Sequence, residues 1–198
     1  MSLTARPSEM TEVRLGEDDG RPVLLVDGAV QSVLADDPDG YWARMVPDVR
    51  PRRALLLGLG AGTVARLLHE RFGEVTVVGV DDDRAVFDFA RELLADLPDL
   101  TIEQGDAFEY VERASSAGER FDYVAVDLYR GDRLAHGVVG RPFLRGLRTL
   151  TEPRGLVIFN LFYERRVYDR IRRIERVFRV VKRELVHRNL ILWTRSGG

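Results

Sequence analysis

The chain has 198 residues, of which 45% are hydrophobic and 31% charged, and its formal net charge is −2. These values are typical of a globular protein with one substantial core, and a near-neutral charge gives no overall attraction to nucleic acid. The lack of cysteine excludes disulfides, zinc-thiolate sites and a cysteine nucleophile. His69, His136 and His187 lie far apart without metal-ligand spacing, so we expect no metal site.

The hydropathy of the chain gives no sign of a membrane or secretory segment. No apolar run approaches the roughly 20 residues that cross a bilayer. Residues 1–7 lack the apolar centre of a signal peptide. We therefore expect a cytoplasmic protein that does not associate with membranes.

Residues 1–46 are predicted to form a small N-terminal β-meander followed by a short helix. Residues 11–15 and 22–26 read as strands, and Asp27-Gly28 before residues 29–33 is a strong hairpin signal. Residues 36–40 read as a loop, and residues 41–45 as a short helix.

Residues 47–198 are predicted to form a Rossmann-like α/β domain with a mostly parallel sheet. Apolar, strand-like runs alternate with segments whose apolar residues recur at helical spacing. The expected strands are residues 54–57, 75–80, 100–103, 121–126 and 156–160, and the expected helices are 64–69, 85–94, 108–113, 143–150 and 164–177. Residues 178–186 and 190–194 are expected to close the sheet as an antiparallel hairpin.

Arginine is dense between residues 165 and 183, over the last expected helix and the start of the strand that follows it. Apolar residues recur there at helical spacing, so we interpret the arginines as the solvated face of an amphipathic helix. A patch that binds RNA phosphates is the alternative.

The glycine-rich turn after residues 54–57 is the strongest indication of function. Gly58, Gly60 and Gly62 stand at alternate positions, where the backbone can turn sharply and approach a ligand. A dinucleotide fingerprint needs glycine at position 63, where this chain has Thr63. The turn instead resembles the G-x-G-x-G loop of class I enzymes that use S-adenosylmethionine (AdoMet). A glycine-rich packing turn and an NAD-dependent dehydrogenase remain as alternatives.

Acids stand at the ends of the next three expected strands. Asp81 is placed to accept hydrogen bonds from both ribose hydroxyls of a nucleoside. The step Gly105-Asp106-Ala107 resembles the adenine clamp of AdoMet enzymes, in which the carboxylate accepts from the amine and the following N–H reaches the ring. Asp106 could equally cap the next helix, and the two roles can coexist. Asp127 ends the fourth strand, at the edge where open α/β sheets bind ligands.

The order of these motifs resembles that of spermidine synthases over about residues 10 to 165. The shared segments are residues 25–31, the Tyr41-Trp42 helix, and residues 56–62, 80–86, 105–108 and 121–127. The resemblance implies that Gln31 lies against the nucleoside, Asp81 holds the ribose and Asp106 holds the adenine amine. It implies that Asp127 faces the reacting centre and that the protein forms a homodimer.

Three departures from the spermidine synthase pattern concern acids and polar groups. Ala61 replaces the acid of the glycine loop, and Arg130 replaces the second acid after the fourth strand. Trp42-Ala43 stands where the family has His-Glu. Aminopropyl transfer needs a base and carboxylates that hold a diamine, whereas methyl transfer needs mainly alignment. We therefore favour methyl transfer from AdoMet to a small molecule, with Arg130 suited to an anionic acceptor.

Asp127 and Tyr129 are the candidate catalytic residues. Asp127 would position the acceptor or act as general base, or else cap the following turn. Tyr129, Asp132 and His136 lie in a glycine-punctuated loop, residues 128–141, that could close as a lid or simply be exposed.

Three other functions remain open. Aminopropyl transfer from decarboxylated AdoMet is the first alternative. An RNA methyltransferase is the second, although the fourth strand lacks the Asn/Asp-Pro-Pro-aromatic step of base-amine methylases, so nucleic acid is an unfavoured partner. The third is a nucleoside-binding module without catalysis.

Overall fold

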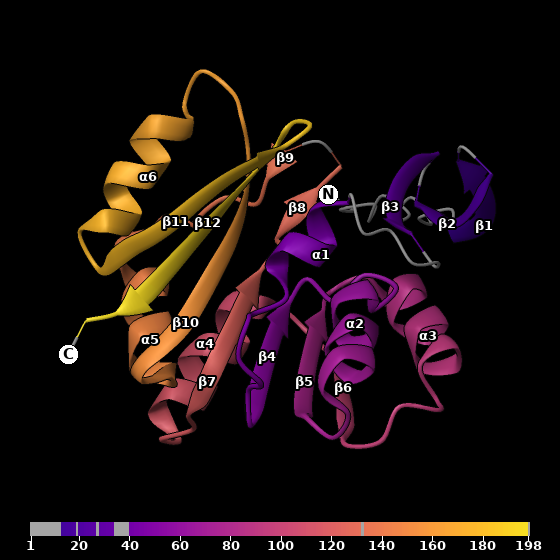
Figure 1. The fold of residues 1–198 in the computed structure, drawn as a ribbon, viewed down its shortest axis with the longest axis horizontal. Helices are drawn as coiled ribbons and strands as arrows, with labels where there is room; N and C mark the ends of the chain where they lie inside the picture. The colour runs from indigo at the N-terminus through magenta and orange to yellow at the C-terminus, as the bar shows by residue number, and fades with distance from the viewer. Residues whose placement is uncertain (1–12, 19, 27, 34–39, 132, 198) are drawn as a thin grey trace, which may run out of the picture.

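The computed structural model describes residues 13–18, 20–26, 28–33, 40–131 and 133–197 (Figure 1). At the N-terminal end, strands β1 (Val13–Asp18), β2 (Arg21–Val26) and β3 (Ala29–Val33) form an antiparallel sheet. Gly28 has a φ of 77° between β2 and β3, as the hairpin signal predicted. The predicted N-terminal meander is therefore confirmed, while the predicted loop at residues 36–39 lies outside the described residues.

A seven-stranded sheet forms the body, in the order β11-β12-β10-β7-β4-β5-β6. Its strands are β4 (Arg53–Leu57), β5 (Thr76–Asp81), β6 (Leu100–Gln104), β7 (Phe121–Val126), β10 (Thr151–Phe162), β11 (Phe178–Val186) and β12 (Asn189–Ser196). Neighbours from β6 to β10 are parallel, whereas β12 is antiparallel to both β10 and β11. This arrangement confirms the predicted Rossmann-like fold with its terminal antiparallel hairpin.

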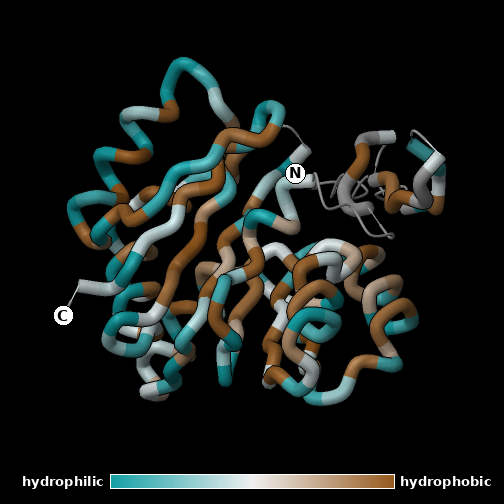
Figure 2. The backbone as a smooth tube through the Cα atoms, in the orientation of Figure 1, coloured by the Kyte–Doolittle hydropathy of each residue, from teal (hydrophilic) through white to brown (hydrophobic). Residues whose placement is uncertain are grey.

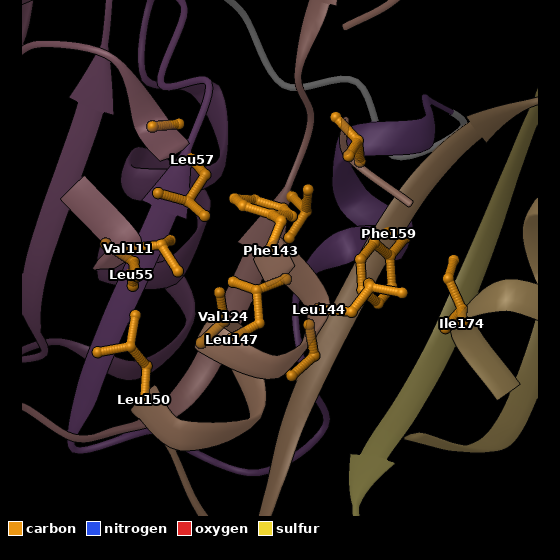
Figure 3. Packing of buried hydrophobic residues seen from close by; sticks show 14 of the residues in the cluster. Leu55, Leu57, Val111, Val124, Phe143, Leu144, Leu147, Leu150, Phe159 and Ile174 are labelled. Atoms are coloured by element: carbon orange, nitrogen blue, oxygen red, sulfur yellow. The ribbon is translucent and has the colours of Figure 1, made fainter. Parts of the chain in front are cut away.

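Helices cover both faces of this sheet. They are α1 (Tyr41–Met45), α2 (Thr63–Phe72), α3 (Arg84–Leu93), α4 (Ala107–Ser116), α5 (Arg141–Leu150) and α6 (Val167–Glu175). Leu55 and Leu57 of β4 pack with α4, α5 and α6 in one cluster, part of which Figure 3 shows. Leu56 packs with α1, α2 and α3 in the other. Because both faces are covered, the central strands are continuous apolar runs (Figure 2).

Two elements differ from the sequence prediction. β10 begins at Thr151 rather than 156, and its register against β7 shifts between Thr151 and Leu156. Arg154 in this stretch has a φ of 68°, an irregular backbone that periodicity does not reveal. The predicted loop 128–141 contains a short hairpin of β8 (Tyr129–Arg130) and β9 (Arg133–Leu134).

The N-terminal residues pack against the glycine loop and the main core. Leu24 of β2 is fully buried against Ala61 and Val86. Met45 of α1 belongs to the same apolar cluster as β4. Its carbonyl accepts a 2.6 Å hydrogen bond from the hydroxyl of the buried Tyr123. The apolar core includes residues on both sides of the predicted domain boundary between residues 46 and 47. That boundary therefore stays a prediction.

Candidate active site

A cavity of about 990 Å³ lies where the parallel strands end. It brings together most of the predicted cofactor and catalytic residues, which are Gly58, Gly60, Asp81, Asp106, Ala107, Asp127 and Tyr129. Gly62 is not among its lining residues and instead caps α2. Gln31 lies in β3, but its side chain falls outside the described residues. Parallel topology explains the convergence, because the carboxyl ends of all these strands meet at one edge.

The glycine loop is folded tightly onto the ends of β5 and β7. The amides of Gly58 and Leu59 both donate to the carbonyl of Val80, at 2.9 and 3.2 Å. Gly58 has a φ of 83°, and a Cβ added to it would lie 2.1 Å from the carbonyl oxygen of Asp127. Both the dihedral angle and the contact therefore require glycine at this position.

Gly58→Ala is expected to destabilise the protein by several degrees of Tm more than Gly118→Ala. Gly118 shares the positive φ, at 75°, but has no atom within 4 Å of an added Cβ. The control thus carries the backbone strain of about 1 kcal/mol without the clash. Thermal unfolding measures both variants, and equal losses of Tm would contradict the close packing of Gly58 on Asp127.

Asp81 holds the glycine loop in place from the end of β5. Its Oδ2 accepts from the Gly60 amide at 2.9 Å, and its Oδ1 accepts from the Asp83 amide at 3.1 Å. Burial raises the pKa of Asp81 to about 6, against the opposing effect of these two donors. Each oxygen retains acceptor capacity, so the carboxylate can also accept from two ligand hydroxyls.

Asp106 caps α4, which confirms the structural interpretation of this residue. Its Oδ1 accepts from the amides of Phe108 and Glu109, at 2.7 and 3.2 Å. Asp106 and Ala107 also line the cavity, so the cap leaves Oδ2 for a ligand amine. The adenine role of Asp106 and Ala107 stays a prediction.

Asp127 follows β7 and is held by two side chains rather than by amides of the following turn. The Tyr41 hydroxyl donates to Oδ2 at 3.1 Å, and the Asn160 amide donates to Oδ1 at 2.8 Å. Burial raises the pKa of Asp127 to about 6, although both hydrogen bonds favour the charged form. A carboxylate with this pKa can exchange a proton near neutral pH.

Sequence analysis did not identify Tyr41 and Asn160 as partners of Asp127. Tyr41 lies in α1, and both burial and the nearby Asp127 charge raise its pKa, so it remains a donor. Asn160 is 1% exposed in β10. A single amide in the apolar run 156–160 was the available signal, but its contact with Asp127 depends on β10 lying beside β7.

Tyr129 anchors β8 to β10. Its hydroxyl accepts from the Phe162 amide at 2.7 Å and donates to the Asn160 carbonyl at 3.3 Å. Its ring centroid lies 4.2 Å from that of Phe162. Burial raises the pKa of Tyr129, which keeps the hydroxyl protonated. These contacts give Tyr129 a structural role, and its catalytic role stays a prediction.

Other residues singled out in the sequence have different surroundings. Arg130 lines the cavity and forms an ion pair with Asp82 at 2.7 Å. His136 also lines the cavity, whereas Asp132 lies outside the described residues. Ala61 is 1% exposed and packs with Leu24 and Val86.

The described part of the chain shows neither a metal-binding cluster nor a membrane-spanning helix. It contains no group of three or more His, Cys, Asp or Glu side chains that could hold a metal ion. None of its helices is long and apolar enough to span a membrane.

Residues 54–155 match the model of a methyltransferase domain family. This range runs from β4 to the middle of β10 and includes the glycine loop and all three strand-end acids. The chain belongs to this family.

Curated relatives carry the name polyamine aminopropyltransferase. The protein of Pyrobaculum calidifontis is 30% identical in a 172-residue alignment that covers 78% of this chain and 59% of the relative. The protein of Vibrio vulnificus is 29% identical over 122 residues, which are 61% of this chain and 41% of the relative. The chain thus spans about half the length of the curated relatives that it matches.

Solved structures with the same fold include two spermidine synthases. A probable spermidine synthase from Corynebacterium glutamicum has a TM-score of 0.77 at 19% identity, covering 94% of this chain and 77% of that one. Spermidine synthase from Thermotoga maritima has a TM-score of 0.71 at 18% identity, covering 99% of this chain and 72% of that one. At these identities the likeness shows the fold, including the N-terminal sheet. Together with the matched domain and the names of the relatives, it confirms that the chain is spermidine synthase-like, as the motif order indicated.

Proposed function

We propose that the protein is an AdoMet-dependent transferase that methylates a small molecule. Asp81 would hold the ribose, Asp106 the adenine amine, and Gly58 and Gly60 would let the backbone approach the cofactor. The cavity suits AdoMet, because it is large enough for a nucleoside and the acids that line it retain free acceptor sites. AdoMet supplies an electrophilic methyl carbon on its sulfonium. Asp127 would take the proton of the acceptor.

The observation that favours methyl over aminopropyl transfer is the buried alanine at position 61. It is buried against Leu24 and Val86, where the spermidine synthase pattern has an acid that meets the cofactor's amino group. The adjoining helix α2 has no acidic residue in its first turn. The positive end of a helix favours a carboxylate nearby, and AdoMet carries one that its decarboxylated form lacks.

Aminopropyl transfer from decarboxylated AdoMet is the second candidate, and the names of the curated relatives favour it. Asp127 would be the base in that reaction too. An RNA methyltransferase has less support. Several arginines around α6 are paired with acids, including Arg172 with Asp169 and Arg183 with Glu175, as on a solvated helix face. We further propose a cytoplasmic homodimer without nucleic-acid or membrane partners.

Calorimetric titration with AdoMet, decarboxylated AdoMet, methylthioadenosine and NAD tests the proposal. AdoMet is expected to bind at least tenfold more tightly than its decarboxylated form. The opposite preference would favour aminopropyl transfer, and a preference for NAD would favour a dehydrogenase. Binding to none of the four would contradict a nucleoside site. The Asp81→Asn variant, titrated in parallel, shows whether the measured heat comes from this cavity.

A further inference from the structure

Among the described residues that line the cavity, Asp127 is the carboxylate that neither accepts from a backbone amide nor pairs with an arginine. We propose that the acceptor is a monoamine with an apolar body, and that its one ammonium group pairs with Asp127. This inference rests on the proposed transferase function. The inference restricts the small-molecule acceptor to molecules with one positive charge and excludes diamines.

The acids that line the cavity, in the part of the chain that the structure describes, differ in what holds them. Asp81, Asp83 and Asp106 accept from backbone amides of the glycine loop and of helix starts. Asp82 and Asp88 are paired with arginines, Arg130 and Arg84. Asp127 instead accepts only from the uncharged groups of Tyr41 and Asn160.

The surroundings of Asp127 favour a cation with an apolar body. Two neutral donors leave the charge of the carboxylate uncompensated, and a buried charge is costly without a counter-charge. An ammonium group supplies that charge, whereas a carboxylate on the acceptor would be repelled. Trp42, Met45 and Leu128 also line the cavity, so the rest of the acceptor meets apolar side chains.

The other described carboxylates that line the cavity are assigned to the cofactor, cap a helix or pair with an arginine, so a second ammonium group would have to compete for one of them. Asp82, which also lines the cavity, already pairs with Arg130 at 2.7 Å. A diamine would have to displace this guanidinium and then remain beside its positive charge. The ion pair also gives Arg130 a counter-charge within the protein, so an amine acceptor is favoured here over the anionic acceptor suggested by the sequence.

Once bound, the ammonium must lose a proton before its nitrogen lone pair can react. Asp127, with which the ammonium pairs, would accept that proton, and burial makes it a stronger base than an exposed aspartate. The proton moves from the acceptor nitrogen to a carboxylate oxygen. The same residue therefore selects the charge of the acceptor and prepares it for reaction.

Three probes with one six-carbon chain test the charge class. Binding of n-hexylamine, 1,6-diaminohexane and hexanoate is measured by calorimetry in the presence of S-adenosylhomocysteine. The monoamine is expected to bind at least tenfold more tightly than either of the others. Tighter binding of the diamine or of hexanoate overturns the inference, and so does the absence of monoamine binding.

Arg130→Gln tests whether the Arg130–Asp82 ion pair causes the preference for the monoamine over the diamine. Freeing Asp82 is expected to raise the affinity for 1,6-diaminohexane at least fivefold and to change that for n-hexylamine less than twofold. Arg133→Gln is the matched control, because Arg133 pairs in register with Arg130 across the hairpin but does not line the cavity. Equal effects of the two variants would contradict a specific role for the Arg130–Asp82 pair.

The two levels of the proposal can fail separately. Binding of S-adenosylhomocysteine without any monoamine preference would overturn this inference alone. If S-adenosylhomocysteine itself does not bind, the proposed function fails. The amine titrations are then repeated on the protein without it, so the charge preference of Asp127 is still measured.

Discussion

Replacing Asp127 with asparagine is expected to lower kcat about 100-fold and to leave the Kd of the cofactor unchanged. Removal of a general base commonly costs 100-fold or more, since the amide cannot accept the proton. Asparagine keeps the size of the side chain and can still bond to Tyr41 and Asn160. Steady-state kinetics with the identified acceptor, and calorimetry with the cofactor, measure the two quantities. Unchanged turnover would remove the catalytic role of Asp127.

The pH dependence follows from the raised pKa of Asp127. The base acts in its ionised form, so the kcat/KM of the wild type, which reports the free enzyme, is expected to fall as pH drops below about 6. Stability changes in the other direction. Because the folded-state pKa of Asp127 lies above its unfolded value, the protonated carboxyl group stabilises the folded protein. This contribution to the free energy of unfolding is lost as pH rises through about 6. The Tm advantage of Asp127→Asn over the wild type is therefore expected to be larger at pH 8 than at pH 4.

Asp122→Asn is the matched control on the same strand. Its two carboxylate oxygens accept from the amides of Arg52 and Arg53, each at 2.9 Å, at the opposite end of β7 from the cavity. An asparagine amide can accept only one of these bonds, so Tm should fall while kcat stays unchanged. A loss of activity in this variant would show that the Asp127 effect is not specific to the site.

The local sequence predicted the parts of the site that lie on single strands and turns. Asp81, Asp106 and Asp127 each follow an apolar run, and the parallel sheet brings such positions together at one edge. The glycine loop could also be predicted, because the turn needs residues without a Cβ at fixed positions and glycine meets that need directly in the sequence. Elements with regular periodicity were therefore placed correctly, apart from their ends.

Contacts between distant segments could not be predicted in this way. Arg130 was expected to meet a substrate anion, yet it pairs with Asp82, 48 residues earlier in the chain. The partners of Asp127 come from α1 and β10, and nothing in their local sequence encodes the neighbour. The β8–β9 hairpin was missed because strands of two residues have no periodicity to detect.

Asp81→Asn is expected to raise the Kd of AdoMet at least 100-fold. Hydrogen bonds to a charged group contribute roughly 1.5–3 kcal/mol each, and a 100-fold change corresponds to about 2.7 kcal/mol. The amide nitrogen of asparagine would also face a backbone donor, either Gly60 or Asp83, and so weaken the glycine loop. Calorimetric titration measures the change.

Asp83→Asn separates this effect from the loss of a negative charge at the cavity. Asp83 also lines the cavity, but its carboxylate caps α3 through the amides of Ala85 and Val86, a role that asparagine fills equally well. Its Kd should stay within threefold of the wild type. Because Asp81 has a pKa of about 6, the affinity of the wild type is also expected to fall below that pH. If both variants weaken binding equally, the cofactor senses only the charge of this region, and Asp81 does not hold the ribose.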